Sequence, residues 1–367
     1  MTQPDGLGSS QEALQGTSEP LAKVFDVALL DLDGVVYRGE DPVAHAAEAL
    51  EKARAQGMRL AFVTNNALRP PDEVACRIRA VGIDADAADV VTSAQAAARL
   101  LAQQLPPGSK VLVSGGVGLR LAVSERGLIP VATAAEEPAA VVSGYDPEIT
   151  YSRLAEACIA IFAGASWIAS NTDATVPSER GLLPGAGALV AIIAAATKAR
   201  PQVAGKPERA LHEEATSRSG AQRPLVVGDR LDTDIEGANR AGAPSLLVMT
   251  GVATLAELIG AAPAHRPTYL GDDLLALLRP APQVVVQAQD SLATCGGWTC
   301  RMHEGRLEWE GTAAPADNMD NMDKGDGLDA VRAALALYWK LSSTGERPRG
   351  IRGPVPPRCE AFTEALG

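Results

Sequence analysis

The sequence predicts an α/β protein with a doubly wound, Rossmann-like parallel sheet, a large inserted α/β domain and a small C-terminal α+β extension. Apolar runs that do not alternate with polar residues are followed by helical stretches that end at a glycine. Parallel strands that are buried on both faces and joined by covering helices show this pattern. A second series of such units interrupts the first, and the pattern changes again beyond residue 280.

The first series forms a core from two separate segments, residues 23–83 and 203–280. Each of its helices is closed by a glycine, which readily adopts the left-handed conformation that ends a helix. The predicted strands cover 24–30, 60–64 and 224–227, and the predicted helices cover 42–56, 71–80 and 233–241.

The second series occupies residues 84–202 and is expected to fold as an inserted α/β domain. In the sequence it lies between the two core segments. Its predicted strands cover 110–114, 139–143 and 167–170, and its helices lie near 119–126, 151–163 and 186–199.

The two ends of the chain differ from these series. Residues 1–22 have no apolar run of signal-peptide length and are expected to be a disordered tail. In residues 281–367 we expect strands at 283–287 and 306–309 and an amphipathic helix at 328–341. We interpret this extension as structural or dimer-forming, so a homodimer is one expected assembly. Its Cys295–Cys300 segment predicts a hairpin turn, because with His303 it offers three zinc ligands where four are needed.

Composition excludes several classes of partner. The 367 residues carry 33 Lys and Arg against 45 Asp and Glu, a net charge of −12, and only 4% are aromatic. Nucleic-acid binders show the opposite charge balance, and anionic membranes attract basic surfaces. No apolar segment reaches the roughly 20 residues that span a bilayer. The five widely spaced cysteines are an odd number and favour a reducing, cytoplasmic location.

Two aspartates directly follow the first predicted strand. Asp31 and Asp33 are two positions apart, so they lie on the same side of an extended chain at the carboxyl edge of the sheet. Two carboxylates this close need a cation or a shared proton. A simple turn is the alternative interpretation, since Asp and Gly are common turn formers.

Polar residues at two other positions suit a phosphoryl group. Thr64, Asn65 and Asn66 follow the second strand and offer neutral donors, although helix capping would use the same residue types. Lys206 precedes Pro207 at an expected helix start, where its ammonium can offset nearby carboxylates.

A third acidic group follows the strand at 224–227. It contains Asp229, Asp232 and Asp234 at the start of the next helix. Several acids at one sheet edge need a counter-ion, and Mg²⁺ fits because this hard cation binds carboxylates, waters and substrate phosphate. A cluster of capping residues is the weaker alternative.

Together these segments resemble the four motifs of the haloacid dehalogenase superfamily of hydrolases. The resemblance covers about residues 24–275. It is closest to subclass IIA, the p-nitrophenylphosphatase and phosphoglycolate phosphatase branch. That branch carries an α/β cap between its second and third motifs, where the inserted domain at 84–202 lies. The extension beyond residue 280 is similar to that of actinobacterial glycerol 3-phosphate phosphatases. The motifs in order are Asp31-Leu32-Asp33-Gly34-Val35, Thr64-Asn65-Asn66, Gly205-Lys206-Pro207 and Gly228-Asp229-Arg230 with Thr233-Asp234-Ile235.

The resemblance implies a role for each site residue. Asp31 would be the nucleophile and Asp33 the general acid and base. Thr64 and Lys206 would bind the phosphoryl oxygens. The remaining implied roles are support of the phosphate pocket by Asn65 and Asn66, Mg²⁺ binding by Asp31, the Asp33 carbonyl and Asp229, and orientation of metal-bound water by Asp234.

The expected activity is Mg²⁺-dependent hydrolysis of a small phosphorylated metabolite, with glycerol 3-phosphate favoured. Phosphoglycolate, a nucleotide or pyridoxal phosphate are alternative substrates within the same fold. A regulatory protein that binds a phosphometabolite or an acyl-CoA is the alternative of another class. For the acyl-CoA role, residues 347–352 only partly resemble a pyrophosphate-binding loop, since arginine stands where a small residue is needed.

Overall fold

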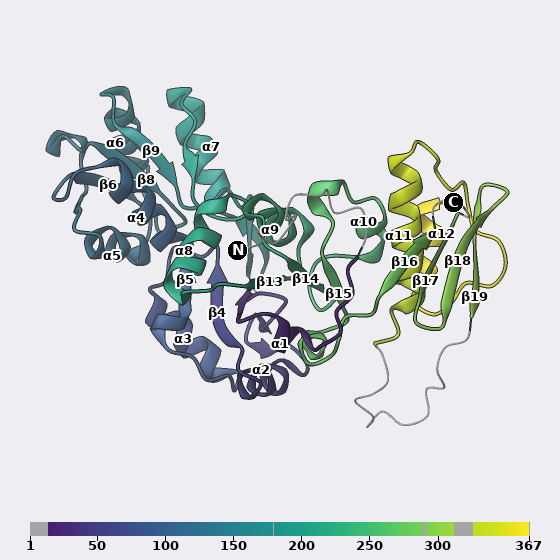
Figure 1. Cartoon of the computed structure of the whole chain (residues 1–367). Helices are drawn as coiled ribbons and strands as arrows, with labels where there is room; N and C mark the ends of the chain where they lie inside the picture. The colour runs from purple at the N-terminus through teal and green to yellow at the C-terminus, as the bar shows by residue number, and fades with distance from the viewer. Residues whose placement is uncertain (1–13, 179, 288, 290, 312–325, 367) are drawn as a thin grey trace, which may run out of the picture.

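The chain folds into a central core with the inserted domain on one side and the C-terminal extension on the other (Figure 1). This arrangement comes from a computed structural model, which describes residues 14–178, 180–287, 289, 291–311 and 326–366. The core separates the two other units, so the extension and the cap lie at opposite ends of the molecule (Figure 1).

A six-stranded parallel sheet forms the core, in the order β15-β14-β13-β1-β4-β5. Alternate residues of β1 enter different apolar clusters, Ala28 and Leu30 on one face and Val27 and Leu29 on the other. Burial of both faces explains why the strand is continuously apolar. The strands are β1 (Val27–Leu30), β4 (Arg59–Thr64), β5 (Val90–Thr92), β13 (Pro224–Gly228), β14 (Ser245–Val248) and β15 (Tyr269–Gly271).

Helices and short turns cover this sheet. Two predicted elements begin later than expected: a short helix α1 (Leu21–Val24) replaces the start of the first strand, and α2 begins at Ala46 because Asp41–Pro42 pairs as a strand with Tyr37–Arg38. After α1, the covering helices are α2 (Ala46–Ala55), α3 (Pro71–Ala80), α8 (Arg209–Ser219), α9 (Glu236–Ala241) and α10 (Leu255–Ile259).

The inserted domain has its own five-stranded parallel sheet, in the order β12-β9-β8-β6-β7. A hairpin of two strands, β10 (Thr175–Ser178) and the exposed β11 (Gly181–Pro184), follows its fourth strand. The sheet strands are β6 (Lys110–Ser114), β7 (Ile129–Val131), β8 (Ala140–Ser143), β9 (Ser166–Ala169) and β12 (Gln202–Val203), and the helices are α5 (Val117–Glu125), α6 (Tyr151–Phe162) and α7 (Ala186–Thr197).

The predicted limits of this domain differ from those that the strand pairing of the two sheets gives. β5 lies within the range 84–202, yet it pairs with β4 in the core sheet, so the predicted limit at residue 84 is too early. At the other end β12 pairs with β9 and extends the cap sheet to residue 203. The following helix α4 (Ser93–Gln104) contacts both α5 of the cap and α8 of the core. A three-residue strand is too short for its sequence pattern to show which sheet it joins.

The expected disordered tail is wrong for residues 14–22. Leu14 is buried, and the backbone N–H of Gln15 donates to the carbonyl of Thr268 at 2.9 Å. The Thr17 N–H donates to the carbonyl of Ala281, also at 2.9 Å. This segment therefore lies along the junction between the core and the extension. Residues 1–13 of the predicted tail lie outside the described residues.

The extension is a four-stranded antiparallel sheet with a long helix packed against it. The predicted hairpin is confirmed, because Cys295 pairs with Trp298 across a two-residue turn. Residues 360–366, for which no helix was predicted, form one whose Phe362 is fully buried. The elements are β16 (Val284–Gln287), β17 (Leu292–Cys295), β18 (Trp298–His303), β19 (Arg306–Gly311), α11 (Asp329–Ser343) and α12 (Glu360–Leu366).

Among the described residues, every helix is too short or too polar to cross a lipid bilayer.

Candidate active site

The carboxyl ends of three neighbouring strands bring the predicted site residues to one edge of the core sheet. β1 lies between β13 and β4, and Asp31, Asp229 and Thr64 stand at the ends of these three strands. In open parallel sheets such an edge, near the point where the strand order reverses, is the usual position of a ligand site. The fold therefore brings together acidic and polar side chains that are nearly 200 residues apart in the chain.

Lys206 provides the positive charge of this edge. It stands three residues before α8, which begins at Arg209 rather than at Pro207 as expected. The ammonium donates hydrogen bonds to Asp31 and to Oδ1 of Asp234, the latter at 2.6 Å. Burial alone would lower the pKa of Lys206, but Asp234 and Asp31 outweigh it and hold the pKa above its ordinary value. The lysine is therefore charged.

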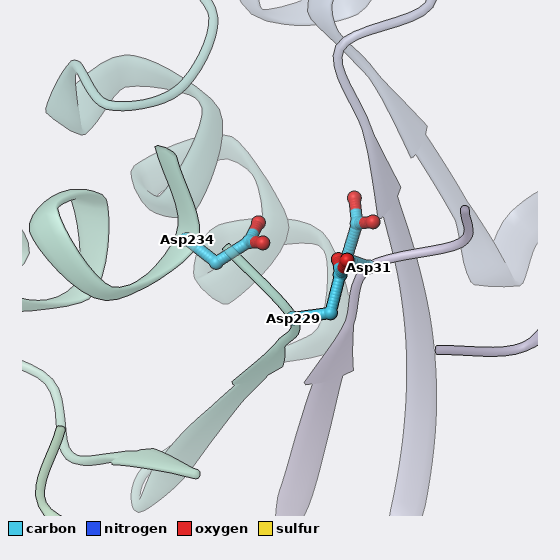
Figure 2. Close-up of side chains that lie close together, drawn as sticks. All are labelled: Asp31, Asp229 and Asp234. Carbon is cyan, nitrogen blue, oxygen red and sulfur yellow. The ribbon is translucent and has the colours of Figure 1, made fainter. Parts of the chain in front are cut away.

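Figure 2 shows three carboxyl groups that lie close together, and two of them accept hydrogen bonds from this lysine. Asp31, Asp229 and Asp234 each offer an oxygen, and these oxygens lie within 4.8 Å of one another. Burial raises the pKa of Asp31 well above its usual range, with Asp234 and Asp229 adding to the effect against Lys206. Burial and Asp234 raise the pKa of Asp229 to about 6. One lysine does not balance three carboxylates, so the site favours a further cation.

The donor set fits Mg²⁺. Oδ2 of Asp229 accepts a hydrogen bond from the backbone N–H of Val252 at 2.7 Å. Its Oδ1 is buried and has no hydrogen-bond partner among the described residues. A buried carboxylate oxygen without a partner is costly unless a cation binds it. Because the candidate metal ligands of the three aspartates are all carboxylate oxygens, a hard divalent ion is the expected partner.

Two glycines leave space for the Asp229 carboxylate. A Cβ on Gly251 would lie 1.8 Å from Oδ2 of Asp229, and a Cβ on Gly34 would lie 2.5 Å from the same oxygen. Gly34 also has a φ of +89°, which L side chains rarely adopt. Backbone therefore packs directly against this carboxylate from both loops.

Asp33 lies at the outer side of the site. Its side chain reaches the solvent, yet partial burial still raises its pKa against the influence of Arg77, Lys206 and Arg69. The guanidinium of Arg77 stacks on the ring of Tyr37, 5.2 Å from its centroid. The raised pKa favours a proton on Asp33, which is what an acid catalyst requires.

The Thr64–Asn66 segment is held by contacts within the protein. Oγ1 of Thr64 accepts a hydrogen bond from the N–H of Asn66 at 3.1 Å, and Oδ1 of Asn66 accepts from Leu68 and Arg69. The Asn65 amide bonds to Asp173 and to both backbone polar groups of Lys206. Both asparagine side chains, expected to serve the phosphate pocket, therefore have protein partners in this structure.

The structure also places residues at the site that the sequence did not single out. Asn171 and Asp173, from the loop after β9 of the cap, contact Asn65. Val252 contributes its backbone N–H to Asp229. The polar residues after β9 are the same kind of signal as Thr64–Asn66 at the end of β4. Each group stands at the carboxyl end of a strand in a parallel sheet. A backbone donor such as Val252 leaves no such signal, because any residue type can supply it.

The fold and the site together define a class of protein, namely α/β enzymes with an acidic metal-binding edge and a cap inserted between two halves of the core. The chain belongs to the haloacid dehalogenase-like hydrolase family. A family model described as haloacid dehalogenase-like hydrolase matches residues 28–129, and a second, described as HAD-hydrolase-like, matches residues 203–277. The resemblance drawn from the four motifs and the predicted fold class are thereby confirmed.

Named relatives extend this similarity to almost the whole chain. The D-glycerol 3-phosphate phosphatase of Mycobacterium tuberculosis is 44% identical over 333 residues, which are 90% of this chain and 91% of that protein. A crystal structure of the glycerol phosphate phosphatase of that organism with magnesium matches with a TM-score of 0.79 and 41% identity, covering 95% of this chain and 99% of the other. The acid sugar phosphatase of Staphylococcus aureus is 38% identical over 64% of this chain and 91% of its own length.

Proposed function

We propose that this protein is a Mg²⁺-dependent phosphatase that hydrolyses small phosphomonoesters through an aspartyl-phosphate on Asp31. The observation that carries the proposal is the buried group of Asp31, Lys206, Asp234 and Asp229, in which one carboxylate oxygen of Asp229 has no partner among the described residues. A nucleophile, a positive charge for phosphoryl oxygens and a place for a hard cation are the parts that phosphoryl transfer requires.

Asp31, the backbone carbonyl of Asp33 and Asp229 would hold the metal, with Asp234 orienting a bound water. Mg²⁺ in this position supplies the charge that neutralises the phosphoryl oxygens during transfer. Asp234 already bonds to Lys206 and to the backbone N–H of Arg230, so its carboxylate has a fixed orientation. The buried side chains thus need little reorganisation when a phosphoryl group arrives.

The chain's own residues divide the reaction between them. A carboxylate oxygen of Asp31 attacks phosphorus and forms the aspartyl-phosphate, while Asp33 protonates the departing alkoxide oxygen. Asp33, now ionised, then takes a proton from the water that attacks the phosphorus. Thr64 and Lys206 bind phosphoryl oxygens, and Asn65 and Asn66 shape the loop that borders them. Inorganic phosphate leaves, and Asp31 returns as a carboxylate.

Glycerol 3-phosphate is the substrate that we propose. The support is the similarity over 90% of the chain to a protein named as a D-glycerol 3-phosphate phosphatase, which includes the cap and most of the extension. On this proposal, cap loops such as the β10–β11 hairpin, whose second strand is exposed, would contact the leaving group. Phosphoglycolate, nucleotides and pyridoxal phosphate remain the alternatives of the same chemistry. We also propose a cytoplasmic location and keep the homodimer as a prediction.

A panel assay tests the proposal. Phosphate release would be measured with glycerol 3-phosphate, phosphoglycolate, pyridoxal phosphate and a nucleotide at one Mg²⁺ concentration. The highest kcat/KM is expected for glycerol 3-phosphate. A higher value for another ester would change the substrate, and no release from any ester, p-nitrophenyl phosphate included, would contradict the phosphatase itself and favour a binding protein.

The contacts of the extension give no support to an acyl-CoA site at residues 347–352. The N–H of Leu307 donates to the carbonyl of Gly350, and the N–H of Arg352 donates to the carbonyl of Leu307. The N–H of Arg349 donates to Gly305. The backbone N–H groups of Arg349 and Arg352 are therefore not free to bind a pyrophosphate, which such a loop would have to do.

A further inference from the structure

The side chain of Asn65 connects the cap to the residue that carries the buried positive charge. Its Nδ2 lies 3.1 Å and 3.2 Å from the two carboxylate oxygens of Asp173, which belongs to the cap. The same nitrogen donates to the backbone carbonyl of Lys206 at 3.2 Å, and Oδ1 accepts from the backbone N–H of Lys206 at 2.8 Å. Both amide hydrogens of Asn65 therefore have protein acceptors.

Three further contacts fix Asn65 in place. The backbone carbonyl of Asn65 accepts hydrogen bonds from Asn171 of the cap at 2.7 Å and from Ser93 at the start of α4 at 2.6 Å. Gly205 packs so closely that an added Cβ would lie 2.6 Å from Oδ1 of Asn65. The Asn65 amide thus stands where the cap loop, α4 and the segment before α8 meet.

The two ends of Lys206 are held by different groups. Its backbone N–H and carbonyl bond to the Asn65 amide, whereas its ammonium bonds to Asp31 and Asp234. A change in the orientation of the amide would shift the main chain of Lys206 and hence the ammonium at the far end of the side chain. The Asp173 carboxylate accepts only from Asn65 among the contacts of its side chain that the structure gives. Together with the backbone N–H of Lys206 it fixes which way the amide faces.

We propose that Asp173 and Asn65 are positioning residues, through which the cap sets the place of Lys206 beside Asp31. Asn65 then acts on the reaction through Lys206 and does not bind the phosphoryl group with its side chain. The kinetic consequence of this inference rests on the proposed phosphatase function. The hydrogen bonds that connect the cap to Lys206 through Asn65 do not depend on that function. The packing of the cap on the core and the position of Lys206 are therefore coupled.

A double-mutant cycle tests this coupling. Asn65→Asp places two carboxylates against each other, while Asp173→Asn keeps an acceptor oxygen of similar shape. In Asn65→Asp/Asp173→Asn the donor and acceptor are exchanged, and the amide introduced on the cap side can again donate to the carboxylate at position 65. We expect kcat on p-nitrophenyl phosphate to fall by about 30-fold or more in Asn65→Asp, by about five- to tenfold in Asp173→Asn, and to recover partly in the double variant.

Chemical labelling of Lys206 gives a second measurement that does not depend on activity. The lysine is 4% exposed, so acetic anhydride is expected to modify it slowly in the wild type. Labelling, followed by mass spectrometry, should rise in Asn65→Asp and fall back in the double variant. The exposed Lys23 serves as the internal reference, and Glu148→Gln, which removes an exposed carboxylate of the same cap, should change neither measurement.

The outcomes separate this inference from the proposed function. Multiplicative losses of kcat in the double variant, or unchanged Lys206 labelling in Asn65→Asp, would overturn the positioning role. Wild-type protein without phosphatase activity would contradict the proposed function alone, because the labelling cycle still reports whether Asp173 and Asn65 hold the lysine. Partial recovery in both measurements is the result that the inference requires.

Discussion

The ammonium of Lys206 donates a 2.6 Å hydrogen bond to Asp234, and their side chains are 4% and 1% exposed. A buried pair of this kind is kept only when its remaining hydrogen-bonding capacity is also used. Here the second carboxylate oxygen of Asp234 accepts from the N–H of Arg230, and the lysine also bonds to Asp31. The pair therefore places a fixed positive charge next to the proposed nucleophile.

Removal of this positive charge should weaken both the fold and the reaction. In Lys206→Met two carboxylates lose their buried partner, which typically costs about 3–5 kcal/mol of unfolding free energy. Urea denaturation in EDTA would measure the loss, and Mg²⁺ should restore part of it by binding only the folded protein. Lys23→Met, which changes an exposed side chain on α1, should cost no more than about 0.5 kcal/mol. Equal losses in the two variants would contradict this account of the site.

Substitution of Gly251 should disturb the metal site without unfolding the protein. The new Cβ of Gly251→Ala would stand 1.8 Å from the Asp229 carboxylate, so this side chain must move. We expect Mg²⁺ to bind at least about tenfold more weakly, a change of about 1.4 kcal/mol in calorimetry. Gly260→Ala is the matched control, since its Cβ would meet nothing closer than 3.8 Å. Unchanged affinity in Gly251→Ala would show that Asp229 does not bind the metal.

Loss of the Asp33 carboxylate should slow the two half-reactions differently. The nitrophenolate ion of p-nitrophenyl phosphate departs without a proton, so Asp33→Asn should still form the aspartyl-phosphate but hydrolyse it slowly. Stopped-flow measurements should show a burst of about one nitrophenolate per active site, followed by turnover about 10²–10⁴-fold slower than wild type. With glycerol 3-phosphate no burst of glycerol is expected, because the alkoxide needs the proton. Asp72→Asn, an exposed carboxylate on α3, is expected to behave like the wild type.

His212 should make stability depend on pH in the acidic range. Burial, with a contribution from Lys206, lowers the pKa of this α8 residue to about 3. Its unfolded value is about 6.5, so between these values the unfolded chain binds the additional proton. Stability is therefore complete above about pH 6.5 and falls with decreasing pH, by at most about 1.4 kcal/mol per unit from this group. Urea unfolding from pH 5 to 7 would show a smaller slope in His212→Met; an equal slope would contradict the prediction.

Much of the site could be predicted because parallel strands end at one edge. Asp31, Thr64 and Asp229 each directly follow an apolar strand, so their positions in the sheet follow from the strand assignment alone. Lys206 precedes a helix that starts near the same edge and leads back to the beginning of β13. Local sequence was therefore sufficient wherever the backbone itself carries a residue into the site.

Contacts between separately folded units could not be predicted in this way. Asp173 reaches Asn65 only because the cap packs on the core, and Leu14 is buried only because the extension lies beside the core. Neither residue lies in a periodic pattern that shows its partner. The residues of the short strand β5 fell within the range predicted for the inserted domain, since a three-residue strand does not show which sheet it joins.

The measurement that tests the central proposal most directly is Mg²⁺-dependent phosphate release by the wild type and Asp31→Asn. We predict turnover of glycerol 3-phosphate and p-nitrophenyl phosphate by the wild type with Mg²⁺, background rates in EDTA, and at least about a 10³-fold loss in Asp31→Asn, since the amide is a poor nucleophile. The variant should still bind the metal through Asp229. Full Mg²⁺-dependent release by Asp31→Asn would contradict the aspartyl-phosphate mechanism.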